Sequence, residues 1–242
     1  GQDRMISVLL NVLAVTVVTL VSGSAVDMSA WLDDVSALVF SWYAGMEGGI
    51  ALAEVLFGAF NPSGHLPETF PVSEKDCPAS AVGEFPGGDK VCYNEDIFVG
   101  YRYYDTCDVA TAFPFGYGLS YTDFVMTGIR AEVIEDTAES KGVKVSFDIS
   151  NIGSRAGAQV AQIYVADKYP RVKKAAKELK AFEKIYLEAG ETREVTLMLE
   201  REAFTYYDEE SHSFKVDAGS YMLLLAKNAE EIVDITEIEF EV

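Results

Sequence analysis

The sequence has few of the residues that build metal centres and disulfide frameworks. Its 242 residues include three cysteines, Cys77, Cys92 and Cys107, with no C-x-x-C pair, and two isolated histidines, His65 and His212. An odd number of cysteines excludes a complete disulfide framework, and the histidines lack the clustered ligands of a zinc site. No cysteine has a base near it that would support a role as nucleophile. We expect no metal site, and we favour three reduced thiols, as in a cytosolic rather than a secreted protein, over one disulfide and a free thiol.

Basic side chains are also scarce. The chain has 19 lysines and arginines against 39 aspartates and glutamates, which gives a net charge of −20 at neutral pH. Such a field repels nucleic acid and anionic membrane surfaces, so neither is an expected partner. One basic stretch, Lys168 to Lys180, is interpreted as a solvated loop and strand edge rather than as a binding site.

The sequence has no apolar run long enough to cross a membrane. Its most apolar stretch, Arg4 to Ala25, falls short of the roughly 18 uninterrupted apolar residues of a spanning helix. A secretory signal peptide is an alternative, but Asp3 disturbs the positively charged leader and no clean A-x-A site follows. We therefore favour a helix and a strand of a buried α/β core. The polar residues that interrupt the run are Ser7, Asn11, Thr16 and Thr19.

Residues 1 to 71 alternate between helical and strand patterns. Apolar residues recur at helical spacing from Met5 to Leu13, whereas Val15 to Val21 is nearly continuous and β-branched, like a strand buried on both faces. A second buried strand is expected at Val35 to Trp42, and a helix with a glycine stop at Ile50 to Phe57. The alternation predicts an α/β layer with parallel strands.

Residues 72 to 140 are predicted to connect two domains and are rich in glycine, proline and aromatic side chains. Just before them, N-P-S-G-H-L-P-E-T-F-P at Asn61 to Pro71 holds three prolines, which predicts an ordered turn followed by an extended piece. Aromatic residues gather at Tyr93 to Asp105 and at Phe113 to Tyr121. A flexible linker would be polar, so we expect these rings to pack this segment on the domains.

Residues 141 to 242 show short alternating apolar runs separated by turn residues. The runs include Val143 to Ile149, Val195 to Leu199, Tyr221 to Leu225 and Ile238 to Val242. This pattern predicts an antiparallel β-sandwich of about seven strands, a module that carries no chemistry by itself.

Several long motifs together resemble one known family. They are S-G-S-A-V-D-M, W-Y-A-G-M-E-G-G-I-A-L-A-E-V-L-F-G, N-P-S-G-H-L-P-E-T-F-P, I-F-V-G-Y-R-Y-Y-D, F-P-F-G-Y-G-L-S-Y and K-E-L-K-A-F-E-K-I. In this order they resemble the C-terminal half of glycoside hydrolase family three, the β-glucosidase family, over essentially the whole chain. The resemblance implies part of a flavodoxin-like α/β sandwich followed by a fibronectin type III-like β-sandwich, and Gly1 and Gln2 look like the end of the family's L-P-x-G-Q stretch.

The resemblance also implies a reaction and a partner. Family members are retaining enzymes that cleave terminal non-reducing β-D-glycosidic bonds without a metal or cofactor, and they need two carboxyl groups about 5 to 5.5 Å apart. In the family the nucleophile lies on a barrel, and the acid/base glutamate comes shortly before L-P-x-G-Q. Both would precede Gly1, so we assign no catalytic, cofactor-binding or metal residue in this chain. The barrel half, in cis or as a separate chain, and a β-glucoside or oligosaccharide are the expected partners.

Two carboxylates of this chain are candidates to substitute for the missing ones. Glu47 precedes a helix at the carboxyl edge of the predicted parallel sheet, where α/β proteins bind ligands. We favour the interpretation that Glu47 only complements the helix dipole, and that Asp27 is a turn or capping residue.

Aromatic residues suggest sugar stacking, but we favour packing for them. The residues are Trp31, Trp42, Tyr43, Tyr101, Tyr103, Tyr104, Phe113, Phe115 and Tyr117. Arg102 is expected to stack on a ring or to pair with an acidic neighbour rather than to bind substrate.

An alternative function is a non-catalytic carbohydrate-binding or protein-interaction module that uses an exposed aromatic face of the β-sandwich. The positions of Phe147, Tyr164, Phe182 and Phe204 argue against it, because they fall on inward-facing positions of the alternating pattern. A naturally split enzyme, whose other chain brings the barrel, is a further alternative. An incomplete α/β sheet would leave an exposed apolar face that promotes aggregation.

Overall fold

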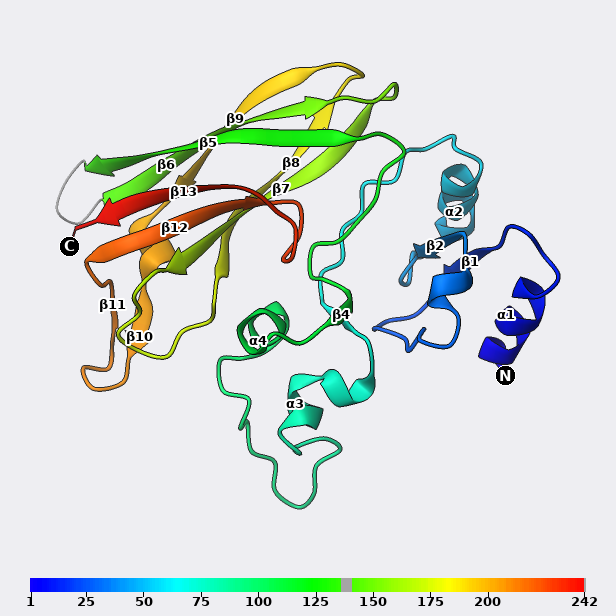
Figure 1. Cartoon of the computed structure of the whole chain (residues 1–242), viewed down its shortest axis with the longest axis horizontal. Coiled ribbons are helices and arrows are strands. Elements are labelled where there is room, and N and C mark those ends of the chain that lie inside the picture. The colour runs from blue at the N-terminus through cyan, green and yellow to red at the C-terminus, as the bar shows by residue number, and fades with distance from the viewer. Residues whose placement is uncertain (136–140, 242) are drawn as a thin grey trace. The chain divides into compact units, whose positions relative to one another are not determined.

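The computed structural model describes residues 1–135 and 141–241, and the chain divides into two compact units (Figure 1). The α/β unit comprises Gly1–Phe60, Thr69–Asp96 and Ala110–Phe113, and the sandwich unit comprises Asn61–Glu68, Ile97–Val109 and Pro114–Val242. Because the segments of the two units alternate along the sequence, the chain passes repeatedly from one unit to the other.

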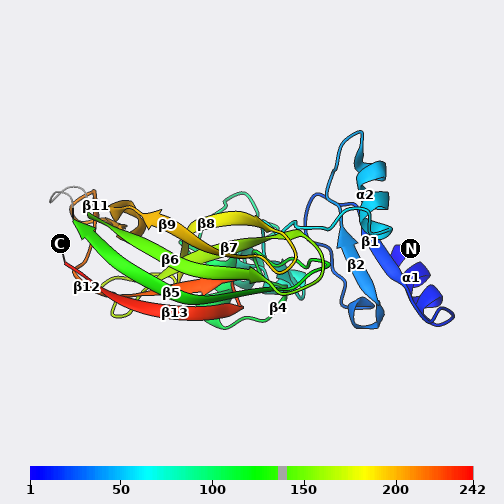
Figure 2. The same cartoon turned by 90° about the horizontal axis from the view of Figure 1, so that it is seen from above.

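The α/β unit is built around two short parallel strands. Strand β1 (Val17–Leu20) pairs with β2 (Ala37–Phe40), and helices α1 (Gln2–Leu10) and α2 (Gly48–Leu56) lie beside the pair in both views (Figures 1 and 2). Helix α2 is followed by Gly58, whose φ of 74° is the left-handed conformation that glycine adopts at helix ends. The predicted order of helix, parallel strand, second strand and helix is thereby confirmed. The other elements are the 3-10 helices η1 (Leu32–Asp34) and η2 (Glu74–Asp76), helix α3 (Pro78–Ala81), and the antiparallel strands β3 (Phe70–Pro71) and β4 (Thr111–Phe113).

Burial of the first strand differs from the prediction. Val18 is buried, but Val17 is 48% exposed, and Val15 and Val21 on either side of the strand are exposed as well. Both faces of a strand are buried only where other layers cover the sheet on both sides, and within the described residues the two-stranded sheet of β1 and β2 leaves Val17 exposed. The expectation of a strand buried on both faces is therefore wrong for this chain.

The sandwich unit consists of two antiparallel sheets. Within the described residues one sheet has the order β13-β12-β7-β8 and the other β5-β6-β9, which gives the seven strands that the sequence predicts. The strands of the two sheets run alongside one another (Figure 2). Their bounds are β5 Phe124–Glu135, β6 Lys141–Asn151, β7 Gly157–Asp167, β8 Glu178–Leu187, β9 Thr192–Leu199, β12 Gly219–Ala226 and β13 Ile232–Phe240.

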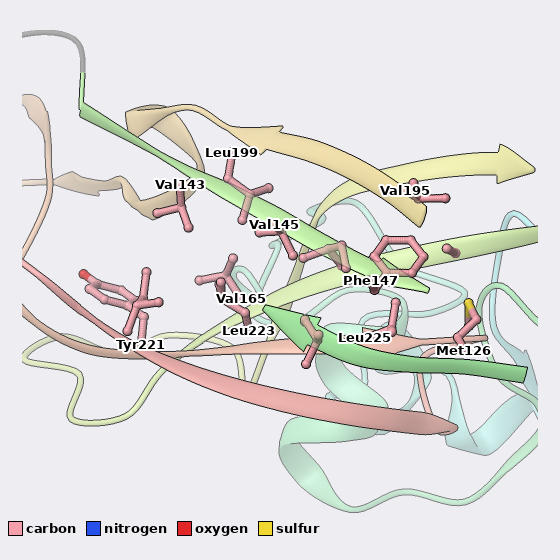
Figure 3. Close-up of a cluster of buried hydrophobic side chains, with 14 of the residues drawn as sticks. Met126, Val143, Val145, Phe147, Val165, Val195, Leu199, Tyr221, Leu223 and Leu225 are labelled. Atoms are coloured by element: carbon pink, nitrogen blue, oxygen red, sulfur yellow. The ribbon is translucent and has the colours of Figure 1, made fainter. Parts of the chain in front are cut away.

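The core of the sandwich unit lies between these sheets. Figure 3 shows Val145 and Phe147 of β6 on one side, and Leu223 and Leu225 of β12 on the other. All four side chains are fully buried. Burial of each such side chain contributes about 1.5–3 kcal/mol, so this core is a main source of stability for the sandwich unit.

Four short elements also belong to the described part of the sandwich unit. Helix α4 (Tyr101–Cys107) precedes the first long strand, the 3-10 helix η3 (Arg201–Phe204) follows β9, and β10 (Tyr206–Asp208) pairs with β11 (Ser213–Lys215) in a hairpin.

Strand β5 lies earlier in the chain than the expected start of the β-sandwich at residue 141. It pairs with β6 from Phe124 opposite Asn151 onward, so residues of the expected connecting segment belong to this sheet. The end of that segment, residues 136–140, and the last residue of the run Ile238 to Val242 lie outside the described residues. The division at residues 71 and 140 stays a prediction. No helix in the described part of the chain combines the length and apolar character that membrane crossing requires.

Candidate functional site

The loops that follow β1 and β2 form the candidate site of the α/β unit, because ligands of parallel α/β sheets bind at the carboxyl ends of the strands. The two loops touch. A Cβ atom added to Gly23, three residues after β1, would lie 2.7 Å from Cε2 of Tyr43, three residues after β2. A glycine at position 23 therefore lets the tyrosine ring pack against the backbone of the neighbouring loop.

The two candidate carboxylates each have a local role in these loops. Glu47 is the N-cap residue of α2, and its side chain makes no capping hydrogen bond. Asp27 accepts hydrogen bonds from the Ser29 hydroxyl at 2.6 Å and from the Ser29 backbone nitrogen at 3.0 Å. These bonds hold the pKa of the Asp27 carboxyl below its usual value. The positions match the favoured interpretation of a helix-terminal acid and a turn residue.

An aromatic cluster of Phe40, Trp42, Phe70 and Phe113 stabilises the loop after β2. Ring centroids are 4.7 Å apart for Phe40 and Trp42, 5.1 Å for Phe40 and Phe70, and 6.3 Å for Phe70 and Phe113. Trp42 has a φ of 51°, a left-handed conformation that is rare for a bulky residue. Edge-to-face packing in the cluster offsets the cost of this backbone conformation.

The other aromatic residues of the α/β unit divide into packed and exposed. Trp31 is buried, and its indole nitrogen donates a hydrogen bond to Asp3 at 3.0 Å. Tyr43 has a ring that is 77% exposed although one edge faces Gly23. Packing is therefore the role of Trp31, whereas the Tyr43 ring is open to a ligand.

Helix α4 packs on the outer face of the four-stranded sheet. Tyr101 lies 5.1 Å from Phe115 and 5.6 Å from Tyr164 between ring centroids, and its hydroxyl accepts a hydrogen bond from the Leu179 backbone nitrogen at 2.8 Å. Tyr164 is fully buried and donates to Gln162 at 2.6 Å, and burial raises its pKa. These rings pack rather than face solvent.

The charged and aromatic neighbours of Tyr101 on the helix are also engaged. Arg102 pairs with Glu178 at 3.1 Å, as expected from the sequence. Tyr104 is buried, and the ring of Tyr103 lies 5.3 Å from it.

Two motifs sixty residues apart meet on the sandwich unit. The Asn61 side chain donates to the Ala156 carbonyl at 2.9 Å and accepts from the Tyr121 backbone nitrogen at 2.7 Å and the Ser120 hydroxyl at 2.9 Å. Nearby, the Leu66 nitrogen donates to the Tyr117 carbonyl at 2.8 Å. The proline-rich motif at 61–71 is thus an ordered turn, as predicted, and its partner is the F-P-F-G-Y-G-L-S-Y motif.

The basic stretch is more buried than expected. Lys174 pairs with Asp167 at 2.6 Å and Lys177 pairs with Asp105 at 2.6 Å, and all four side chains are largely buried. The interpretation as a solvated loop is wrong for these two lysines, because carboxylates of the sandwich unit neutralise them. Lys168 is more exposed and pairs with Glu237.

Two of the four aromatic residues predicted to face inward, Tyr164 and Phe182, lie on the outer face of the four-stranded sheet. Phe147, Tyr164 and Phe204 are buried, but Phe182 is 66% exposed. Phe182 lies on the edge strand β8, opposite Gln162 of β7, and Gln162 is on the outer face of the sheet with Tyr164. The predicted inward position is therefore wrong for both Phe182 and Tyr164, and Tyr164 is nevertheless buried because Tyr101 and Phe115 pack against it.

The cysteines and histidines remain separate. Cys77, Cys92 and Cys107 form no disulfide within the described residues, and those residues include no cluster of three or more His, Cys, Asp or Glu side chains able to hold a metal ion. His65 contacts the Ser63 carbonyl through Nδ1 at 3.2 Å and Gln159 through Nε2 at 3.2 Å, and burial lowers its pKa.

Comparison with known proteins assigns this architecture to a family. The family model described as glycosyl hydrolase family 3 C-terminal domain matches residues 1–121, which is half of the chain. The chain belongs to glycosyl hydrolase family 3. A second family model, the fibronectin type III-like domain, matches residues 159–229.

Relatives in the family are similar to the chain along nearly its whole length. Thermostable beta-glucosidase B of Acetivibrio thermocellus is 41% identical over 234 residues, which cover 96% of this chain and 30% of that protein. Beta-glucosidase B of Emericella nidulans is 38% identical over 254 residues, which cover 100% of this chain and 29% of that protein. The chain therefore spans about a third of the length of these family members.

Solved structures of the family share the fold. The crystal structure of beta-glucosidase from Kluyveromyces marxianus in complex with glucose is similar with a TM-score of 0.93 and 37% identity, over 100% of this chain and 28% of that chain. The Bifidobacterium adolescentis GH3 beta-glucosidase gives a TM-score of 0.90 and 34% identity, over 99% of this chain and 35% of that chain. The predicted fold class, an α/β part followed by a fibronectin type III-like β-sandwich, is confirmed.

Proposed function

We propose that this chain is the supporting C-terminal part of a retaining β-glucosidase that cleaves terminal non-reducing β-D-glycosidic bonds. The observation that carries the proposal is the match of 96% of the chain to 30% of Thermostable beta-glucosidase B. Double displacement needs a nucleophile and an acid/base carboxyl group about 5 to 5.5 Å apart. In this proposal both groups belong to the part of the enzyme that the chain does not span, and no residue of the chain is catalytic.

The local roles of the two candidate carboxylates support this assignment. Glu47 begins helix α2, where a negative charge is stabilised by the helix dipole. Asp27 is held by both hydrogen-bond donors of Ser29. Each carboxylate thus has a structural reason for its position that requires no substrate.

Exposed apolar side chains of the α/β unit support a partner for it. On α1 the side chains of Met5, Val8 and Leu9 are exposed, and Val17 of β1 is half exposed. Met5, Val8 and Leu9 are spaced three and four residues apart, so they share one face of α1, and exposed apolar surface of this kind marks an interaction site. In the complete enzyme the preceding part, in cis or as a separate chain, covers these residues and brings the barrel.

The sandwich unit acts as a buttress in this proposal. Its core is complete, and Tyr101 and Arg102 fix helix α4 on it through Leu179 and Glu178. A rigid support of this type keeps catalytic groups elsewhere in an enzyme within the narrow geometry that catalysis requires.

Hydrolysis of an aryl β-glucoside tests the proposal. The purified chain is assayed alone, together with a separately expressed N-terminal part of a family relative, and the N-terminal part is also assayed alone. We expect no turnover by either piece and turnover by the mixture, with a stable complex of the two in size-exclusion chromatography. Turnover by the chain alone would overturn the claim that it lacks the catalytic carboxylates. A folded chain that forms no complex and restores no activity would overturn the supporting role.

A further inference from the structure

Helix α4 is held by the loop between β7 and β8, residues 168–177, which we name the strap. Lys177 Nζ lies 2.6 Å from the Asp105 carboxylate, and these side chains are only 13% and 11% exposed. The Ala176 backbone nitrogen donates a hydrogen bond to the Thr106 hydroxyl at 3.0 Å. At the other end of the segment, Lys173 lies 4.4 Å from the centre of the Phe98 ring.

These contacts continue into the first residues of β8. Arg102 pairs with Glu178 at 3.1 Å, and Tyr101 accepts a hydrogen bond from the Leu179 nitrogen at 2.8 Å. Directional, mostly polar contacts therefore join segment 97–109 to the strap and to the start of β8, beside the buried side chains of Phe98 and Tyr104.

The main core of the sandwich unit does not depend on this attachment. Its buried side chains, as far as the described residues go, come from the long strands, from the 3-10 helix η3 and from Val216, and none comes from segment 97–109. Tyr101 instead packs against a smaller cluster that contains Tyr164, Ala166 and Leu224. Regions with few apolar contacts to a core can open locally at a lower free energy than that of global unfolding.

Opposing effects act on the pKa of Asp105 in the ion pair with Lys177. Burial raises the pKa of Asp105, the Lys177 ammonium lowers it, and the nearby charge of Glu230 raises it further. A buried pair of this type contributes little as long as both partners are present, but loss of one partner leaves an uncompensated buried charge. The attachment should therefore respond strongly to removal of a single member of the pair.

We propose that the strap and helix α4 form a latch, centred on Lys177 and Asp105, that opens as a unit while the β-sandwich stays folded. Segment 97–109 is preceded and followed in the chain by residues of the α/β unit. The latch thus fixes, within the sandwich unit, a segment that residues of the α/β unit precede and follow in the sequence, and its opening releases this segment without loss of the sandwich core.

Amide hydrogen exchange, followed by mass spectrometry on peptides from α4 and from β12, tests the latch. The variants are Lys177→Met, which removes the charge within the latch, and Lys168→Met, the matched control on the same strap, whose partner Glu237 lies on β13. We expect Lys177→Met to raise exchange in α4 about tenfold or more while exchange in β12 stays at the parent level. Lys168→Met should exchange as the parent does in both peptides.

Two results would overturn the proposal. One is a Lys177→Met variant whose α4 exchanges no faster than in Lys168→Met. The other is an increase of equal size in α4 and β12, which would mean that helix and β-sandwich open together. If Lys177→Met does not fold, amide exchange of the parent chain in increasing guanidinium tests the proposal instead. The α4 amides must then exchange at a lower guanidinium concentration than the β12 amides, and exchange of both at the same concentration would overturn the proposal.

Discussion

The side-chain oxygen of Asn61 accepts a hydrogen bond from the backbone nitrogen of Tyr121, sixty residues further along the chain, at 2.7 Å. The amide nitrogen of the same side chain donates to the Ala156 carbonyl. One side chain therefore joins the proline-rich turn, the aromatic F-P-F-G-Y-G-L-S-Y motif and the loop between β6 and β7.

Asn61→Ala is expected to lower the free energy of unfolding by about 1–3 kcal/mol, because it removes the donor to the part-buried Ala156 carbonyl and the acceptor of the Ser120 hydroxyl. Asn61→Asp keeps the acceptor but sets a carboxylate oxygen against the Ala156 carbonyl oxygen, so it should also destabilise the chain. Urea denaturation followed by fluorescence measures both. The control is Asn11→Ala, which removes one exposed hydrogen bond to Ser7 at the end of α1. An Asn61→Ala variant as stable as this control would contradict the role of Asn61.

Gly118→Ala is expected to destabilise the chain by about 1–3 kcal/mol, the range of a forced overlap in a packed region. A Cβ atom at position 118 would collide with the backbone carbonyl oxygen of Gly64, which no side-chain rotation can relieve. The control is Gly49→Ala, since a Cβ atom there has no neighbour within 4 Å and the residue lies in helix α2. It should raise stability by about 0.5–1 kcal/mol. Thermal unfolding of both variants and of the parent gives the direction of each change in stability. A change in the same direction for both variants would contradict this account.

Stability should decrease as the pH falls below about 6.5, in part because of His65. Burial lowers the pKa of His65 in the folded chain below its ordinary value of 6.5, so the unfolded chain binds more protons between the two values. The contribution of His65 is thus complete above the unfolded pKa and is lost as the pH falls through it toward the folded value.

Urea denaturation of His65→Gln between pH 7.5 and pH 5 tests this dependence. The variant should show a shallower loss of stability than the parent over this range. His212→Gln is the matched histidine substitution at an exposed turn of the β10–β11 hairpin, away from Ser63 and Gln159. If the stability of His65→Gln depends on pH as steeply as that of the parent, His65 does not contribute to the pH dependence of stability.

Charge introduced on the exposed face of α1 is expected to raise solubility without a loss of stability. Met5 and Val8 are exposed on this helix, whereas Ile6 is buried. Met5→Lys combined with Val8→Lys should therefore increase the concentration at which the chain stays monodisperse in light scattering, because it divides an apolar patch. Ile6→Lys, the control on the same helix, should destabilise the α/β unit. Unchanged aggregation in the double variant would mean that this face is not the cause.

The sequence predicts the fold well where a regular period extends over several residues. The alternation in Val143, Val145 and Phe147 gives the inward face of β6 directly, and all three are fully buried. The spacing of Ile50, Ala53 and Leu56 by three residues likewise predicts helix α2. The alternating pattern is weaker evidence for which face of a sheet a side chain lies on. Phe182 has an alternating position on edge strand β8, but its side chain points outward.

Contacts between distant segments could not be derived from periodicity. Asn61 and Tyr121 meet because of turns and glycines, and no period connects them. For the latch, the sequence does contain a signal, because the two motifs carry opposite charges. Arg102 and Asp105 of one motif pair with Glu178 and Lys177 of the other, respectively. Charge complementarity between the two quoted motifs could have predicted this pairing, whereas composition alone predicted a solvated strap.

The substitution Glu47→Gln tests the central claim most directly. The kcat for an aryl β-glucoside is measured on the complex of this chain with the N-terminal part of a family relative, with and without the substitution. Glutamine keeps the shape of the side chain and removes its charge. The supporting role predicts that the Glu47→Gln complex retains kcat within about twofold of the parent complex, because general acid–base catalysis, worth about 10²–10⁴-fold, is supplied by the other part. A fall in kcat of a hundredfold or more, in a variant that folds and binds its partner as the parent does, would contradict it and would place a catalytic carboxylate in this chain.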